Sequence, residues 1–296
     1  MSTKQRIAIV TGANKGVGLA AVRQLALKYP TSPLNTGGSL LIYLAARSPE
    51  RGEEAVQTLL DDAQLREAGV LVQQGGSVTV KFRELDIGSA ESVAALGEFL
   101  KKEHESGVDV VINNAGIALK GFDSAIVRET IRTNYHGTLD VCTTLLPLLK
   151  PSPQSRLVNV ASISGMLDAY SPAIQANFHA AVNKGSIPAV TALMEKFQHS
   201  VDADRVEEAG FVKRAYGVSK AGVIAFSKVL AEQQRQDGVV VNACCPGYVA
   251  TSMTEHMDRP GAITPDEGAR TLVMLALQDL DGKRGEFWRE EKVVEW

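Results

Sequence analysis

The chain has 296 residues, of which 45% are apolar, and it carries a formal net charge of −3 with a pI near 6.0. The length and apolar content allow a large buried core, and the weak, dispersed charge gives no reason to expect nucleic acid or an anionic membrane as a partner. The polar start of the sequence is not followed by an apolar signal segment, and the longest apolar run, residues 40–46, is too short to cross a bilayer. We therefore expect a cytoplasmic protein.

Short apolar stretches alternate along the chain with segments of helical periodicity. The predicted strands cover residues 6–11, 40–46, 78–85, 108–113, 157–161, 239–244 and 285–288. The predicted helices cover residues 16–28, 49 to between 60 and 68, 89–104, 124–149 and 215–236. This alternation predicts an α/β fold, a doubly wound (Rossmann) and mainly parallel seven-stranded sheet with helices on both faces, as a single domain over residues 1–296.

Three glycines, Gly12, Gly16 and Gly18, follow the first predicted strand and open the first predicted helix. In this context the backbone N–H groups and the helix dipole point at the pyrophosphate of a dinucleotide. We expect Gly12 to permit a tight turn, Gly16 to let the ligand approach the backbone, and Gly18 to allow close helix packing. The spacing, Gly-x3-Gly-x-Gly, differs from the Gly-x-Gly-x-x-Gly of the commonest dehydrogenases.

Tyr216 and Lys220 are four residues apart in a predicted helix, so their side chains share one helix face. A free tyrosine is a poor proton donor at neutral pH because its pKa is near 10. A fixed cation nearby favours the phenolate, so we expect Lys220 to lower the pKa of Tyr216. The pair predicts an acid tuned for proton transfer.

Cations gather where the second predicted strand ends. Arg47 follows that strand, Arg51 lies in the first turn of the next helix, and Lys15 stands in the glycine loop. NAD sites have an acidic residue at this strand end, whereas a 2′-phosphate requires cations, so the pattern favours NADPH. The alternative is that the glutamates at positions 50, 53 and 54 pair with these arginines in ordinary surface ion pairs.

Together these motifs resemble the short-chain dehydrogenase/reductase family. The remaining marks of the resemblance are Leu85-Asp86-Ile87, Asn113-Asn114-Ala115-Gly116, Thr133-Asn134, Ser162 and Pro246-Gly247. Residues 10–16, 142–150, 242–247 and 291–296 resemble more closely the monomeric NADPH-dependent carbonyl reductases of animals. The resemblance implies reduction of a ketone, aldehyde or quinone by hydride transfer from NADPH.

The same resemblance implies four catalytic residues. Tyr216 would give its proton to the carbonyl oxygen, and Lys220 would bind the nicotinamide ribose and keep Tyr216 acidic. Ser162 would donate a hydrogen bond to the substrate oxygen, where charge develops. Asn134 would hold a water that links Lys220 to solvent.

For NADPH/NADP+ the resemblance implies a wider set of contacts. Asp86 would meet the adenine amino group, Asn113 the adenosine ribose, and Val249 with Thr251 the nicotinamide side. The full expected set is Gly12, Asn14, Lys15, Gly16, Val17, Gly18, Arg47, Arg51, Asp86, Ile87, Asn113, Ala115, Gly116, Tyr216, Lys220, Pro246, Gly247, Val249 and Thr251. We expect no metal site.

The segment between the serine and the tyrosine is unusually long. Tyr216 follows Ser162 by 54 positions, whereas most members of the family separate the two by about a dozen residues. We expect residues 163–215 to contain a helical insertion, in which Ser186 caps a helix with an apolar stripe used for core packing. The family uses the helix before the tyrosine as a subunit interface, so an insertion over it implies a monomer.

The substrate is less well defined by the sequence. An apolar pocket over the nicotinamide could be lined by Phe122, Met166, Tyr248 and Met253, although each could equally serve packing. Cys245 is expected near the site, and either a reactive thiol or an inert buried one fits the pattern. The three cysteines show no metal spacing and are expected to be reduced.

Two other functions stay open. The chemistry is reversible, so the protein could oxidise a hydroxysteroid or another secondary alcohol. A cofactor-binding redox sensor without turnover is the alternative from another class. The complete Asn, Ser, Tyr and Lys set favours an enzyme, since a sensor needs no proton relay.

Overall fold

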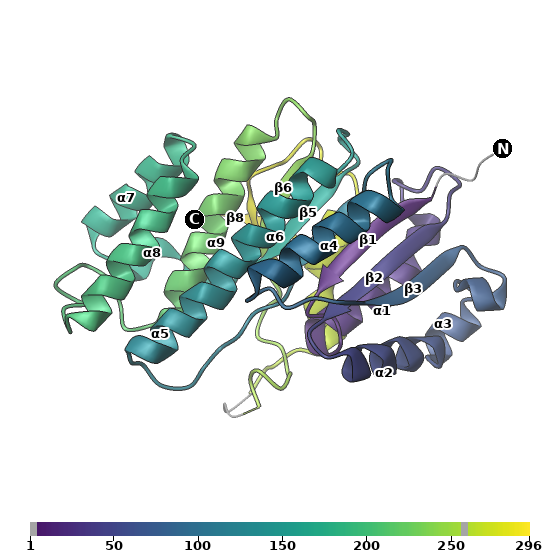
Figure 1. Ribbon diagram of the computed structural model, residues 1–296, viewed down its shortest axis with the longest axis horizontal. Coiled ribbons are helices and arrows are strands. Elements are labelled where there is room, and N and C mark those ends of the chain that lie inside the picture. Colours follow the sequence, from purple (N-terminus) through teal and green to yellow (C-terminus); the bar gives the residue numbers. More distant parts are fainter. Residues whose placement is uncertain (1–4, 256–259) are drawn as a thin grey trace.

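Eight strands form one sheet in the computed structural model, which describes residues 5–255 and 260–296 (Figure 1). The strands are β1 (Arg6–Thr11), β2 (Leu40–Ala46), β3 (Val78–Glu84), β4 (Val110–Asn113), β5 (Arg156–Val160), β6 (Val240–Cys245), β7 (Phe287–Arg289) and β8 (Lys292–Val294). Their order is β3-β2-β1-β4-β5-β6-β7-β8, and every neighbouring pair is parallel except β7 with β8. The doubly wound, mainly parallel fold is confirmed.

The eighth strand was not expected from the sequence. It pairs with β7 through a two-residue turn in which Glu290 and Glu291 have φ values of 50° and 61°. Turns with positive φ at both central positions are usually signalled by glycine, asparagine or aspartate. Two glutamates carry no such signal, so the hairpin was missed.

Ten α-helices occur in the described part of the chain. They are α1 (Gly16–Lys28), α2 (Pro49–Leu60), α3 (Ala63–Glu67), α4 (Ala90–Glu103), α5 (Ser124–Ile131), α6 (Thr138–Leu145), α7 (Pro172–Asn183), α8 (Ile187–Asp202), α9 (Ala215–Gln233) and α10 (Pro265–Leu277). The long helix predicted over residues 124–149 is interrupted by a π-helix at Arg132–Gly137. The helix predicted from residue 49 divides at Asp62, whose side chain caps α3 by accepting a hydrogen bond from the Leu65 N–H.

Helices cover both faces of the sheet. On β1, Ile7 and Ile9 pack into a core shared with α4, α5, α6 and α9, whereas Ala8 and Val10 pack into a second core with α1, α2 and α10. Successive strand residues point to opposite faces, so a strand buried on both sides must be apolar throughout. This is why β1 and β2 read as continuous apolar runs.

The strand order reverses direction between β1 and β4, and such a switch point opens a crevice at the carboxyl ends of the strands. The turn after β1 is tightly packed there. Gly12 has a φ of 63°, and a Cβ on it would lie 2.8 Å from the Ala115 Cα. A Cβ on Gly18 would lie 2.5 Å from the Gly12 carbonyl oxygen, so both positions require glycine.

Two helices lie between Ser162 and Tyr216. Helices α7 and α8 pack against α9 and against each other (Figure 1). The Ser186 side chain caps α8 by accepting a hydrogen bond from the Ala189 N–H, and the expected apolar stripe of α8 is buried in the core at Val190, Met194 and Phe197. The structure contains this helix, and Ile187, the fourth residue of the expected stripe, is partly buried against the same core.

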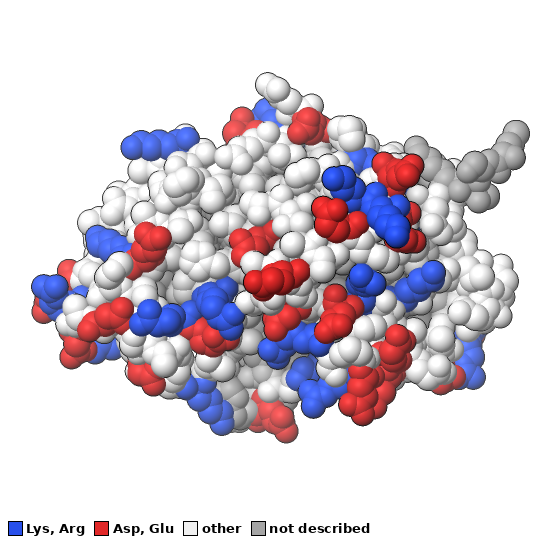
Figure 2. All heavy atoms as spheres, viewed as in Figure 1, with Lys and Arg blue, Asp and Glu red and all other residues white. Residues whose placement is uncertain are grey.

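Acidic and basic side chains are interspersed over the face shown in Figure 2. This face shows no large field of a single sign, which agrees with the near-neutral net charge. Within residues 5–255 and 260–296, no helix combines the length and apolar character that a bilayer crossing requires.

Candidate active site

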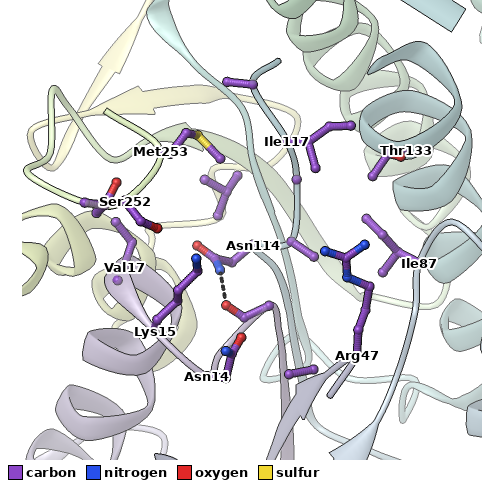
Figure 3. Close-up of a pocket in the computed structure, with 18 of the residues that line it drawn as sticks. Asn14, Lys15, Val17, Arg47, Ile87, Asn114, Ile117, Thr133, Ser252 and Met253 are labelled. Atoms are coloured by element: carbon purple, nitrogen blue, oxygen red, sulfur yellow. Dashed lines mark hydrogen bonds between the residues drawn. The ribbon is translucent and has the colours of Figure 1, made fainter. Parts of the chain in front are cut away.

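A cavity of about 490 Å³ lies at the switch point of the sheet (Figure 3). Its lining comes from the carboxyl ends of the strands, from α9 and from the loop after β6. The predicted site residues that line it are Gly12, Asn14, Lys15, Gly16, Val17, Arg47, Asp86, Ile87, Ala115, Gly116, Tyr216, Lys220, Pro246 and Thr251. Residues that are far apart in the sequence therefore meet in one place.

Seven predicted residues do not line the cavity. These are Gly18, Arg51, Asn113, Asn134, Ser162, Gly247 and Val249. Gly18 and Val249 are buried in packing around the cavity, and Arg51 is exposed on α2. Asn134 and Ser162 lie just behind the lining, where Asn134 contacts Ile117 and Ser162 is close to Tyr216.

The two asparagines after β4 point in different directions. The Asn113 side chain is buried, and its amide donates hydrogen bonds to Asn159 Oδ1 at 2.8 Å and to the sulfur of Cys142. The neighbouring Asn114 lines the cavity, and its amide donates to the carbonyl oxygens of Thr11 and Gly12. Adjacent residues at a strand end face opposite sides, so the Asn113 side chain, expected at the ribose, belongs to the core instead.

Tyr216 and Lys220 lie one turn apart on α9, as their spacing predicts. The Lys220 ammonium is 5.6 Å from the centroid of the Tyr216 ring. The Ser162 hydroxyl is close enough to the Tyr216 phenol to lower its pKa as a hydrogen-bond partner. The structure thus brings together a phenol, a hydroxyl and an ammonium at one end of the cavity.

Burial governs the acidity of both groups. It raises the pKa of Tyr216 to about 12, with a smaller contribution from Cys245, while the hydrogen bond with Ser162 opposes the rise. It also lowers the pKa of Lys220 to about 8. The spacing of Tyr216 and Lys220 predicts a lowered tyrosine pKa, and the structure gives the opposite direction, because desolvation of the phenolate is the largest influence on this group.

Asn134 occupies the π-helix that interrupts the helix predicted there. It is fully buried, its Oδ1 accepts a hydrogen bond from the Ile117 N–H, and its amide donates to the Ile117 carbonyl and to Ser219 on α9. A Cβ on Gly116 would lie 3.1 Å from Asn134 Oδ1 and 3.5 Å from the Lys220 ammonium. The small residue at position 116 therefore leaves space between the asparagine and the lysine.

The other end of the cavity is lined by charged groups. Lys15 and Arg47 extend into it in Figure 3, and Asp86 also lines it. Glu129 and Arg132 line the same end, form an ion pair at 2.8 Å, and were not singled out from the sequence. The hydrogen bonds from Arg132 lower the pKa of Glu129, and Arg47 adds to this effect.

Arg132 also donates a hydrogen bond to the Gly88 carbonyl oxygen at 2.6 Å, which connects this pair to the Asp86 turn. Glu129 and Arg132 are three positions apart, a spacing that commonly pairs charges on an exposed helix face. Only the fold shows that this face borders the cavity.

The cavity fits a phosphorylated dinucleotide. Gly16 and Thr251 are neighbours in its lining, and a Cβ at position 16 would come within 3.3 Å of the threonine methyl group. The backbone can therefore approach a pyrophosphate at the start of α1, where the helix N-terminus favours an anion. Lys15 and Arg47 stand where an additional phosphate would need cations.

The parallel sheet, the glycine turn and the Tyr/Lys helix define a Rossmann-type dinucleotide-binding protein. The chain belongs to the short chain dehydrogenase family, whose model matches residues 6–206 and 200–260. The carbonyl reductases 1 (NADPH) of Pongo abelii and Homo sapiens are each 39% identical to it over 309 aligned positions, which cover 100% of this chain and of each relative.

Solved structures of two plant enzymes share the fold. Salutaridine reductase from Papaver somniferum is 25% identical, with a TM-score of 0.77 over 96% of this chain and 99% of its own. Menthone neomenthol reductase from Mentha piperita is 26% identical, with a TM-score of 0.74 over 96% of this chain and 98% of its own.

The expected substrate-pocket residues are only partly brought together. Met253 lines the cavity and is 37% exposed, and Tyr248 is exposed nearby on the same loop. Phe122 and Met166 are partly buried against the core. Cys245 is buried, and its sulfur accepts a hydrogen bond from the Gly247 N–H.

Proposed function

We propose that this protein reduces the carbonyl group of a ketone, aldehyde or quinone to an alcohol with NADPH, using Tyr216 as the general acid. The observation that carries the proposal is the meeting of the Tyr216, Ser162 and Lys220 side chains at one end of a cavity whose other end holds Lys15 and Arg47. The full-length similarity to NADPH carbonyl reductases supports the same chemistry.

When bound, NADPH would supply the hydride for the carbonyl carbon, and residues of the chain would supply the proton. Tyr216 donates its phenolic proton to the carbonyl oxygen, while Ser162 stabilises that oxygen by a hydrogen bond. A pKa raised by burial keeps Tyr216 protonated at neutral pH, which is the form that reduction requires. Oxidation of an alcohol would require the phenolate instead, which burial disfavours.

Lys220 and Asn134 would return a proton from solvent to Tyr216 after the reaction. The Lys220 ammonium donates a hydrogen bond to the Val160 carbonyl oxygen and faces the space beside Gly116. Asn134 borders the same space from the π-helix. We assign Lys220 to the nicotinamide ribose and to the polarisation of Tyr216, and Asn134 to a water that connects Lys220 with solvent.

The choice of cofactor rests on charge. Two cations, Lys15 and Arg47, line the cavity near the end of β2, and the residue that follows β2 is arginine rather than an acid. A 2′-phosphate would gain charge-assisted hydrogen bonds there. We therefore propose NADPH rather than NADH as the cofactor.

Steady-state assays of NADPH and NADH oxidation at about neutral pH test the function. The substrates are menadione, an aromatic aldehyde, an α-diketone, a steroid ketone and a monoterpene ketone. Turnover with NADPH is expected, together with at least tenfold weaker use of NADH, roughly the value of one charge-assisted hydrogen bond. Cofactor binding without reduction of any of these substrates would favour the redox sensor, and faster oxidation of the corresponding alcohols with NADP+ would favour the reverse reaction.

We also propose that the protein is a monomer. The family's subunit interface would lie at the helix before the tyrosine, and helices α7 and α8 of the insertion lie in this region, where both pack on α9 and α8 also packs on α5. Light scattering coupled to gel filtration should give a mass near 31.7 kDa. A mass of twice or four times this value would show that another surface associates.

A further inference from the structure

Trp296 contacts the turn that carries Ser162. Its indole N–H donates a hydrogen bond of 2.7 Å to the carbonyl oxygen of Gly165. Gly165 ends a single 3₁₀ turn, Ile163–Gly165, whose N-cap is Ser162. The indole therefore binds the C-terminal end of this turn, and Ser162 caps its N-terminal end.

The same turn is pressed against α9. A Cβ on Gly165 would lie 2.7 Å from the backbone carbonyl carbon of Lys220, and a Cβ on Gly217 would lie 2.7 Å from the Ser164 carbonyl oxygen. Neither glycine has room for a side chain. Any shift of the turn along α9 would therefore change the position of Ser162 relative to Tyr216.

The tryptophan ring is itself fixed by the helices between Ser162 and Tyr216. It packs edge-on against Phe178, with ring centroids 5.9 Å apart, and lies at the same distance from His179. Both residues belong to α7. Trp296, at the chain end marked C in Figure 1, therefore connects α7 with the active-site turn.

We propose that Trp296 is a positioning residue for the reaction, because it fixes the Ser162 turn against α9 and so sets the hydrogen bond between Ser162 and Tyr216. This inference rests on the proposed function, in which both hydroxyl groups meet the carbonyl oxygen. Trp296 does not line the cavity. Its effect on catalysis passes through the turn alone.

The test is Trp296→Phe, which keeps an aromatic ring against α7 and removes only the donor to Gly165. Trp288→Phe is the matched control, because Trp288 is buried in β7 and its indole nitrogen has no hydrogen-bond partner among the described residues. Both variants, the wild type and Tyr216→Phe are assayed as full chains in both reaction directions. NADPH affinity and thermal unfolding are measured for each.

The hydrogen bond with Ser162 lowers the pKa of Tyr216, so weakening it raises that pKa. Alcohol oxidation needs the phenolate, so its rate falls on the acid side of the pH–rate profile. In Trp296→Phe this acid limb should move to higher pH by roughly half a pH unit or more. We expect kcat for reduction to fall about 3- to 10-fold, with NADPH affinity unchanged. Trp288→Phe should leave the pH profile unchanged.

If the wild type is active and the acid limb of the pH–rate profile lies at the same pH in Trp296→Phe, the positioning role is overturned, even if the variant unfolds at a lower temperature. An equal shift in Trp288→Phe would also overturn it, because the effect would then be a general consequence of loosening the fold. A wild type without turnover in either direction would overturn the proposed function itself and this inference with it.

Discussion

The two ends of the cavity are built in different ways. The end with Lys15, Arg47, Glu129 and Arg132 is lined by charged side chains on loops and helix ends, and Lys15 and Arg47 are exposed. The end with Tyr216 and Lys220, which we propose to be catalytic, is built from polar groups held in packed secondary structure, and Lys220 is only 4% exposed. One end is open to water and salt, and the other is largely shielded from them.

This difference predicts how each end responds to change. Exposed charges act at a distance, are screened by salt, and can be replaced one at a time with modest effects. Buried polar groups require fixed partners, so a substitution removes an interaction and leaves another group without its partner. We expect the exposed end to control cofactor affinity and choice, and the buried end to control turnover and stability.

The largest effect is expected for Tyr216→Phe. Without the phenolic hydroxyl no proton reaches the carbonyl oxygen, and kcat should fall by about 10² to 10⁴. The ring still fills its place on α9, so NADPH affinity, measured by fluorescence titration, should change less than about twofold. A variant that retains turnover would remove Tyr216 from the acid role.

Lys220→Met should reduce kcat by about 10-fold or more and also change the dependence of stability on pH. The folded pKa of Lys220, about 8, lies below the ordinary value of 10.5, so between these values the unfolded chain binds a proton that the folded chain lacks. The free energy of unfolding should therefore rise with pH across this window in the wild type.

That rise should be smaller in Lys220→Met, as measured by urea unfolding at a series of pH values. Lys184→Met is the control, because Lys184 is exposed after α7 and its removal also deletes one ammonium group. Parallel curves for the wild type and Lys220→Met would show that Lys220 keeps its ordinary pKa in the folded protein.

At the exposed end, Arg47→Ala should weaken NADPH binding by about 10-fold to 100-fold, the value of a charge-assisted hydrogen bond. Arg51→Ala should have a smaller effect, since Arg51 does not line the cavity. NADH affinity should be nearly unchanged in both, and the wild-type preference for NADPH should shrink as salt is added. Equal losses for NADPH and NADH would contradict a phosphate site at Arg47.

The smallest effect is expected for Glu129→Gln. The carboxylate attracts Arg47 as well as Arg132, so removing its charge should tighten NADPH binding by about two- to threefold without affecting NADH. Isothermal titration against Glu98→Gln, an exposed change on α4, provides the comparison. Weaker NADPH binding in Glu129→Gln would mean that the Glu129–Arg132 pair supports the adenine end instead of competing for Arg47.

Much of the fold and of the candidate site could be predicted from local sequence patterns. The strand and helix alternation, the glycines after β1 and the Tyr216 to Lys220 spacing each depend on a few neighbouring residues, and the structure places them as expected. Three features of the structure could not be predicted from such patterns. The direction of the Asn113 side chain, the π-helix at Asn134 and the hairpin turn at Glu290 have no distinctive local composition.

The sequence by itself determined the fold class, the position of the dinucleotide loop and the candidate acid, because periodicity, glycine and side-chain spacing act over short distances along the chain. Only the tertiary structure decided the acidity of Tyr216, the approach of Glu129 and Arg132 to the cavity, and the contact of Trp296 with the Ser162 turn. Desolvation and long-range contacts depend on which distant segments surround a group, and those neighbours exist only once the sheet and its helices are packed.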